Sequence, residues 1–102
     1  MQEWHIYLVR TRHGSLYTGV ATDVARRLTE HEKAGGRGAK YLRSKGPLKL
    51  AYEMKIGDRA LALKVERSIK KLSKDQKERI VFTTPDGEAL LHLLGFSESV
   101  PP

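Results

Sequence analysis

The chain has 102 residues, a length suited to one compact domain with a single core. Its 19 Lys and Arg residues outnumber its 12 Asp and Glu residues; the formal net charge of +7 favours a polyanionic partner, above all nucleic acid. The absence of cysteine excludes disulfides and thiolate metal sites, and the four histidines lack the paired spacing of a zinc site. No apolar run is long enough to span a membrane, and no signal-peptide pattern is present. We therefore expect a cytoplasmic protein with no membrane role.

Two short strands rich in β-forming residues are predicted near the N-terminus, Trp4–Val9 and Leu16–Gly19. A three-residue loop between them, with Gly14 at positive φ, pairs Tyr7 with Gly19. This register places Tyr7 and Tyr17 on one face of the sheet as diagonal neighbours. A two-residue loop would separate them onto opposite faces.

An amphipathic helix is predicted directly after the second strand. Asp23, or Thr22 beside it, can cap this helix by accepting hydrogen bonds from its first backbone N–H groups. Arg27 and His31 are spaced i and i+4, so they lie one turn apart on one flank of the helix. A strand that carries an aromatic hydroxyl, followed by a helix with Arg and His, can form a phosphate site. The alternative is an ordinary strand–helix corner with a solvated basic helix.

A glycine-rich stretch follows, from Ala34 to Gly46, and it contains no acidic residue. Its basic side chains are Arg37, Lys40, Arg43 and Lys45. Glycine lets the backbone approach a phosphate closely, and the basic side chains neutralise the phosphate charge. The stretch lacks the Gly-Lys-Ser/Thr ending of a P-loop. Contact with nucleic acid is expected, the alternative being a flexible solvated loop.

The second half of the chain predicts one strand and three helices. Apolar residues alternate at Leu48, Leu50, Tyr52 and Met54, which is typical of a strand over 47–55. Asp58 caps the next helix, and the segment from Ser73 to Gln76 has the capping-box form. The helices are expected over 59–72, from 73 to about 81, and over 86–94, with Gly95 closing the last one.

Glu66 is a single carboxylate at the edge of the apolar stripe of the helix predicted over 59–72. It lies among five basic residues of the same segment, Lys64, Arg67, Lys70, Lys71 and Lys74. In such surroundings a carboxylate most often forms an i,i+4 ion pair, here with Lys70. It could equally serve as a metal ligand, and composition alone does not choose between the two.

Taken together, these residues resemble the GIY-YIG nuclease superfamily, and most closely its small stand-alone YhbQ-like group. His5-Ile6-Tyr7 and Tyr17-Thr18-Gly19 stand where the two tripeptides of the family stand. Arg27 matches the arginine of the family's first helix, His31 matches its second helix position, and Glu66 matches its metal-binding glutamate. The resemblance covers residues 3 to 82.

The resemblance implies an α+β fold, with a small three-stranded antiparallel sheet flanked by helices. Residues 1–82 would form the nuclease-like domain, and residues 83–102 would add a short C-terminal helix and tail to the same domain. Three positions depart from the family pattern. His5 replaces the glycine of the first tripeptide, Val20 stands where many relatives have lysine, and Asp75-Gln76-Lys77-Glu78 stands where many have an asparagine.

The resemblance also implies hydrolysis of a phosphodiester bond with one divalent cation, Mg²⁺ or Mn²⁺. Glu66 would hold the cation, and Arg27 would hold the non-bridging phosphate oxygens as a planar bidentate donor. Tyr7 would orient or deprotonate the attacking water, with Tyr17 beside it. Because a free tyrosine has a pKa near 10, either nearby cationic groups lower the pKa of Tyr7 or His31 takes the proton.

Two hypotheses of different classes follow. The first is a metal-dependent endonuclease acting on DNA, with repair or recombination intermediates as candidate substrates. Its nucleic-acid-binding residues would be Arg37, Lys40, Arg43, Lys45 and Lys70. The second is a non-catalytic nucleic-acid-binding domain that keeps the scaffold and the basic surface. The presence of both Arg27 and Glu66 favours the nuclease. We expect a monomer, and the sequence does not distinguish DNA from RNA.

Overall fold

The computed structural model describes residues 2–32 and 48–96; the basic residues predicted to meet phosphate, Arg37, Lys40, Arg43 and Lys45, lie outside these ranges. The described residues form three strands, β1 (Trp4–Arg10), β2 (Leu16–Ala21) and β3 (Lys49–Gly57). They also form four helices, α1 (Val24–Glu32), α2 (Arg59–Lys70), α3 (Lys74–Thr83) and α4 (Gly87–Leu93). The strands form one antiparallel sheet in the order β2-β1-β3, which confirms the expected α+β class.

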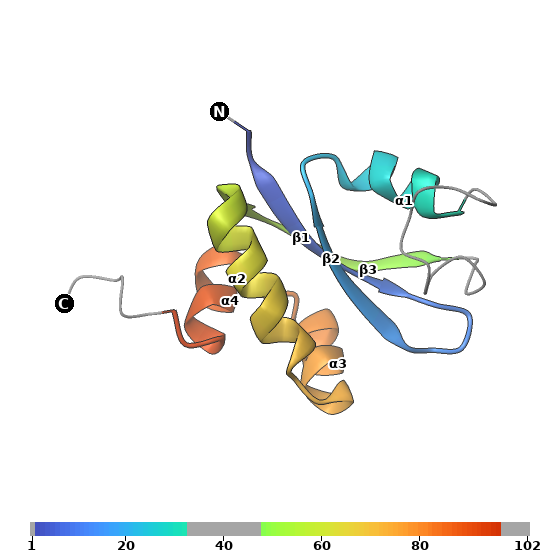
Figure 1. Ribbon diagram of the computed structural model, residues 1–102. Helices are drawn as coiled ribbons and strands as arrows, with labels where there is room; N and C mark the ends of the chain where they lie inside the picture. Colours follow the sequence, from blue (N-terminus) through green and yellow to red (C-terminus); the bar gives the residue numbers. More distant parts are fainter. Residues whose placement is uncertain (1, 33–47, 97–102) are drawn as a thin grey trace.

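Helices cover both faces of the sheet. Figure 1 shows α2, α3 and α4 gathered on one side and α1 on the other. On the first side Ile6 and Leu8 of β1 pack with Val65 and Ile69 of α2, and all four side chains are buried. Ile80 of α3, Leu90 of α4 and Tyr52 of β3 complete this main core. On the second side a smaller cluster joins Tyr7, Val9, Ala21 and Val24, with Tyr17, Leu28 and Leu48 packed against it.

The hairpin between β1 and β2 has the predicted register. Tyr7 pairs with Gly19, and Val9 pairs with Tyr17. The Thr11 backbone N–H donates to the Ser15 carbonyl at 3.0 Å, and Gly14 has a φ of +87°. The three-residue loop is therefore confirmed, and with it the placement of both tyrosines on the α1 side. β2 ends at Ala21, two residues beyond the predicted end.

Strand β3 differs from the simple alternation that its sequence predicts. The register between β1 and β3 shifts between Leu8, which pairs with Tyr52, and Val9, which pairs with Leu50. Because side chains alternate with a period of two, the extra residue moves the strand's first part to the other face. Leu48 consequently packs in the Tyr7 cluster, while Tyr52 belongs to the main core and Leu50 is 42% exposed.

Side-chain caps begin all four helices, and those of α1, α2 and α3 were expected from the sequence. Asp23 Oδ1 accepts from the Arg26 backbone N–H, and Asp58 and Asp86 cap α2 and α4 in the same way. Ser73 and Gln76 form the predicted capping box of α3. Two predicted ends were wrong by about two residues, since α2 stops at Lys70 and α3 continues to Thr83. Within the described residues, no helix is both long and apolar enough to cross a membrane.

One charged cluster attaches the hairpin to α3. Arg10, the last residue of β1, donates from both terminal nitrogens to the Glu78 carboxylate, at 2.7 and 2.8 Å. Lys74 also donates to Glu78, at 2.9 Å, and Arg10 and Lys74 both donate to the Gly14 carbonyl of the turn. The hydrogen bonds from Arg10 and Lys74 lower the pKa of the Glu78 carboxyl to about 2.

Replacing Glu78 should therefore give a destabilisation that depends on pH. Since the folded-state pKa lies below the ordinary value of 4.5, the stabilisation is present above about pH 4.5 and is lost as the pH falls towards 2. The pair is about one third exposed, so Glu78→Gln should lower the unfolding free energy at pH 7 by only about 1 kcal/mol. Urea denaturation at a series of pH values checks this. Glu88→Gln on the exposed side of α4 is the control, and a Glu78→Gln effect that does not shrink in acid would contradict the assignment.

Candidate active site

The candidate site begins with the side chain of Tyr7, which crosses the edge strand of the sheet over Gly19. Tyr7 is 1% exposed. A Cβ atom placed on Gly19 would collide with the Tyr7 hydroxyl and would lie only 2.5 Å from Cζ. Only glycine leaves room for the ring at this position. The second tripeptide therefore ends in glycine because the tyrosine of the first tripeptide lies across it.

The Tyr7 hydroxyl meets His31 in the last turn of α1. Tyr7 Oη lies 3.2 Å from His31 Nε2, and His31 is 3% exposed. The ring of Tyr17 contacts the imidazole edge-on, with 6.3 Å between the ring centroids. Two tyrosines from two strands thus contact one buried histidine, as the predicted register requires.

Burial moves the pKa values of Tyr7 and His31 in opposite directions. The pKa of Tyr7 is raised to about 12, chiefly by burial, with Tyr17 and Glu66 adding to the rise and Arg27 opposing it. For His31, burial lowers the pKa below 6.5; the charge of Arg27 acts in the same direction, and Glu30 opposes it. The expectation that nearby cations bring Tyr7 towards the phenolate is therefore not met. At neutral pH the hydroxyl keeps its proton and the imidazole is neutral.

Arg27 lies one turn before His31 and shares a carboxylate with its neighbour Arg26. Arg27 Nη1 lies 3.3 Å from Glu30 Oε1, and Arg26 Nε lies 3.4 Å from Glu30 Oε2. Arg26 is far more exposed than Arg27, yet it reaches the same acceptor. Sequence reasoning missed Glu30, although its i+3 and i+4 spacing from the two arginines was a visible signal.

Glu66 lies on α2, on the other side of the edge strand. Its side chain is 19% exposed and forms the predicted i,i+4 ion pair with Lys70, at 3.3 Å. It nevertheless belongs to the same electrostatic neighbourhood, because its charge contributes to the raised pKa of Tyr7. In residues 2–32 and 48–96 no three His, Asp or Glu side chains form a metal-binding group. A single accessible carboxylate still fits Mg²⁺, which commonly takes one or two carboxylates and completes its shell with water and substrate phosphate.

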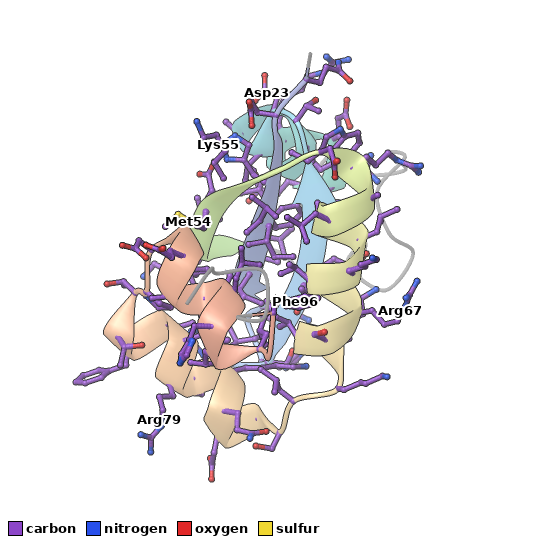
Figure 2. All side chains as sticks on the ribbon, turned by 90° about the vertical axis from the view of Figure 1, so that its left-hand side faces the viewer. Asp23, Met54, Lys55, Arg67, Arg79 and Phe96 are labelled. Atoms are coloured by element: carbon purple, nitrogen blue, oxygen red, sulfur yellow. The ribbon has the colours of Figure 1, made fainter. Side chains whose placement is uncertain are left out.

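In the part of the chain that the structure describes, two neighbouring hollows lie along α2. The larger, about 410 Å³, lies between the beginnings of α1 and α2 and is lined by Trp4, Arg26, Arg27, Glu30, Arg59 and Leu63, among others. The smaller, about 320 Å³, is lined by Leu63, Glu66, Arg67, Lys70 and Lys71. Leu63 lines both, so the hollow beside Arg27 and the one beside Glu66 are neighbours along α2. Figure 2 shows Arg67 pointing outward from α2.

The structure thus brings together most of the predicted site. Tyr7, Tyr17, Arg27 and His31 lie on the α1 side, and Glu66 approaches from α2 around the edge strand. Lys70 is the one predicted nucleic-acid-binding residue within the described ranges, and it lies beside Glu66. Trp4 and Arg59 line the larger hollow and were not predicted. Neither belongs to a recognisable motif, and only the fold places them together.

The family model of the GIY-YIG catalytic domain matches residues 3–79, so the chain belongs to the GIY-YIG family. Within that family its relatives carry the name UPF0213. A UPF0213 protein of Yersinia enterocolitica is 56% identical over 82 residues, which cover 80% of this chain and 82% of the relative. UPF0213 protein YhbQ of Salmonella typhimurium is 52% identical over 94 residues, covering 92% of each protein.

Two solved structures have a similar fold. The solution NMR structure of a UPF0213 protein from Bacillus halodurans has a TM-score of 0.52 and 36% identity, covering 80% of this chain and 85% of that one. A solution NMR structure of a protein from E. faecalis has a TM-score of 0.56, also at 36% identity, covering 82% and 88%. The small three-stranded domain predicted from the resemblance is therefore confirmed.

Gly19→Ala should force the Tyr7 ring out of its place. Because the new Cβ overlaps the end of the ring, the unfolding free energy should fall by about 1–3 kcal/mol, the usual cost of overpacking. In a Tyr7→Leu background the overlapping atoms are gone, and the added cost of Gly19→Ala should largely disappear. A double-mutant cycle by urea denaturation measures the difference. The same cost in both backgrounds would show that the Tyr7 contact is not the reason for glycine.

His31 should titrate below 6.5 in the folded protein, because burial and Arg27 both disfavour its charged form. The stability contributed by the neutral ring is present above about pH 6.5 and is lost as the pH falls through the lowered pKa. Arg27→Ala should raise the midpoint, measured by NMR on the imidazole C–H signals and assigned with a His31→Gln variant. Arg26→Ala removes the same charge from a more exposed neighbour and should have a smaller effect. An unchanged midpoint in Arg27→Ala would contradict the electrostatic coupling.

Proposed function

We propose that this protein is a divalent-metal-dependent endonuclease that hydrolyses phosphodiester bonds in DNA, at repair or recombination intermediates. The observation that carries the proposal is the contact between Tyr7 Oη and His31 Nε2, held beside the Arg27 guanidinium. This arrangement places a proton donor and a proton acceptor next to a cation suited to phosphate. Membership of the GIY-YIG family supports the same class of reaction.

In the proposed reaction Tyr7 and His31 act as a proton relay. The attacking water gives a proton to Tyr7 Oη while the proton on Tyr7 Oη passes to His31 Nε2. Tyr7 is neutral before and after this step, so its pKa of about 12 does not prevent the reaction. His31 is the net base, and its lowered pKa keeps it neutral and ready to accept at pH 7. Tyr17, in edge contact with the imidazole, would hold that ring in place.

Arg27 and Glu66 supply the charges that the reaction needs. The Arg27 guanidinium would exchange its contact with Glu30 for two non-bridging phosphate oxygens, to which it can donate in bidentate fashion. Glu66 would hold one Mg²⁺ or Mn²⁺, with Lys70 released from its ion pair to meet phosphate. When bound, the cation would supply stabilisation of the negative charge that develops on the leaving oxygen. Further phosphate contacts would come from Arg37, Lys40, Arg43 and Lys45.

Glu66→Gln is the variant that tests the enzyme most directly. It keeps the shape of the side chain but removes its charge, so cleavage should fall by at least about 10²-fold. The unfolding free energy should change by only about 0–1 kcal/mol, since the ion pair with Lys70 is partly exposed. Binding without metal should be kept or strengthened, because a negative charge near the phosphates is gone. Cleavage of duplex, single-stranded, flap and branched DNA with Mg²⁺ or Mn²⁺ is the measurement.

Two further variants complete this test. Glu88→Gln makes the same change of charge on α4 and should leave cleavage unchanged. Arg27→Ala should reduce the rate by a similar factor and also weaken DNA binding. The near-complete burial of Tyr7 and His31 also suits a second candidate function, a nucleic-acid-binding domain without catalysis. That function is the correct one if the wild type cuts none of these substrates and the variants differ in binding alone.

A further inference from the structure

The larger hollow contains a cation–π pair that the proposed reaction does not use. Trp4 begins β1, and Arg59 is the first residue of α2. The Arg59 guanidinium carbon lies 5.6 Å from the centroid of the indole, within the range of a cation–π contact. Trp4 is half-buried, whereas Arg59 is exposed. The guanidinium over the indole therefore belongs to an exposed side chain, which a flat ligand could displace.

The pairing between two strands is also irregular next to Trp4. The pairing of β1 with β3 shifts register between Trp4 and His5. Such bulges change the direction of a side chain at the end of a strand. Here Trp4 contributes to the wall of the hollow together with Val20 of β2 and Leu63 of α2. An indole at the wall of this hollow, beside the side chains of Arg26 and Arg59, is a surface on which another flat group can stack.

We propose that this hollow is a subsite for one unpaired nucleotide next to the cleaved phosphate, with its base stacked on Trp4. The location next to a cleaved phosphate rests on the proposed function, whereas the stacking of a base on Trp4 does not. A nucleobase is flat and binds an indole face, and it would take the place that the Arg59 guanidinium now occupies. Arg59, once displaced, and Arg26 would then face the sugar–phosphate backbone. The volume of about 410 Å³ falls in the range of small-molecule sites.

The hollow lies close to the residues that are proposed to act on the phosphate. Arg59, Leu63 and Glu66 follow one another at i, i+4 and i+7, so they share one face of α2. Arg59 and Glu66 are about 10 Å apart along the helix axis. Arg27 lines the same hollow from α1. A strand with its base on Trp4 can therefore continue past Arg27 towards Glu66. Because a base inside a continuous duplex cannot stack on protein, the subsite selects DNA with an unpaired nucleotide at this point.

Trp4 is the only tryptophan of the chain, so its fluorescence reports on this hollow alone. The probes are an oligothymidylate and an abasic strand of the same length, with the same phosphates and no bases, titrated without metal. The oligothymidylate should quench Trp4 and the abasic strand should not. It should also bind about tenfold more tightly, the scale of one base stacked on an aromatic ring. Equal quenching and equal affinity would overturn the proposal.

Variants separate stacking from charge, with affinity measured by anisotropy of labelled strands. Trp4→Leu should abolish the difference between the two strands, and if it fails to fold, Trp4→Phe should reduce that difference. Arg59→Ala should weaken binding of both strands and keep the difference. Arg79→Ala is the matched control, because Arg79 lies at the opposite end of the molecule from Asp23, which lines the hollow (Figure 2). Arg79→Ala should leave the quenching of Trp4 intact. A difference in affinity between the two strands that survives in Trp4→Leu would also overturn the subsite.

These outcomes are independent of cleavage. A protein that cuts DNA but shows no base-dependent quenching of Trp4 would lose the subsite and keep its proposed function. A protein that shows the quenching but cuts no DNA would keep the subsite and lose the nuclease assignment.

Discussion

The passage of Tyr7 across Gly19 is the contact on which the rest of the site depends. It brings a hydroxyl from the middle strand to the outer edge of the sheet, where His31 of α1 meets it at 3.2 Å. A slip of one residue in the hairpin would turn Tyr7 to the other face and would remove the contact. Gly14 in the turn and the Arg10–Glu78 pair at its base both hold that register.

The two faces of the sheet divide stability and chemistry between them. The face covered by α2, α3 and α4 has an almost entirely aliphatic core, with Ile6, Leu8 and Ile69 completely buried. The α1 face is smaller and buries Tyr7 and His31, which are polar groups that cost free energy unless they are paired. The large core can stabilise the domain while the α1 face keeps a polar pair in a low-dielectric setting.

Local signals explain how much could be predicted from the sequence. Loop length and Gly14 determine the hairpin register, and the caps at Asp23, Asp58 and Ser73 mark where helices begin. The packing of Leu48, just before β3, on the opposite face from Tyr52 could not be predicted, because a bulge arises from pairing with β1 and leaves no mark in the alternation itself. The meeting of Trp4 with Arg59 and the burial of Tyr7 are likewise long-range effects, so neither the hollow nor the raised pKa followed from spacing.

The electrostatics of the site bear on which group would act as the base. Of the influences on Tyr7, burial is the largest, and Arg27 is the one that favours the phenolate. A phosphate held by Arg27 would offset that charge and add a negative one, so the pKa of Tyr7 would rise further. The same phosphate would weaken the effect of Arg27 on His31, whose pKa would return towards 6.5. Substrate binding would therefore make the imidazole a better proton acceptor and would make the phenolate of Tyr7 harder to form. Both effects favour the proton relay over direct deprotonation of the water by a tyrosinate.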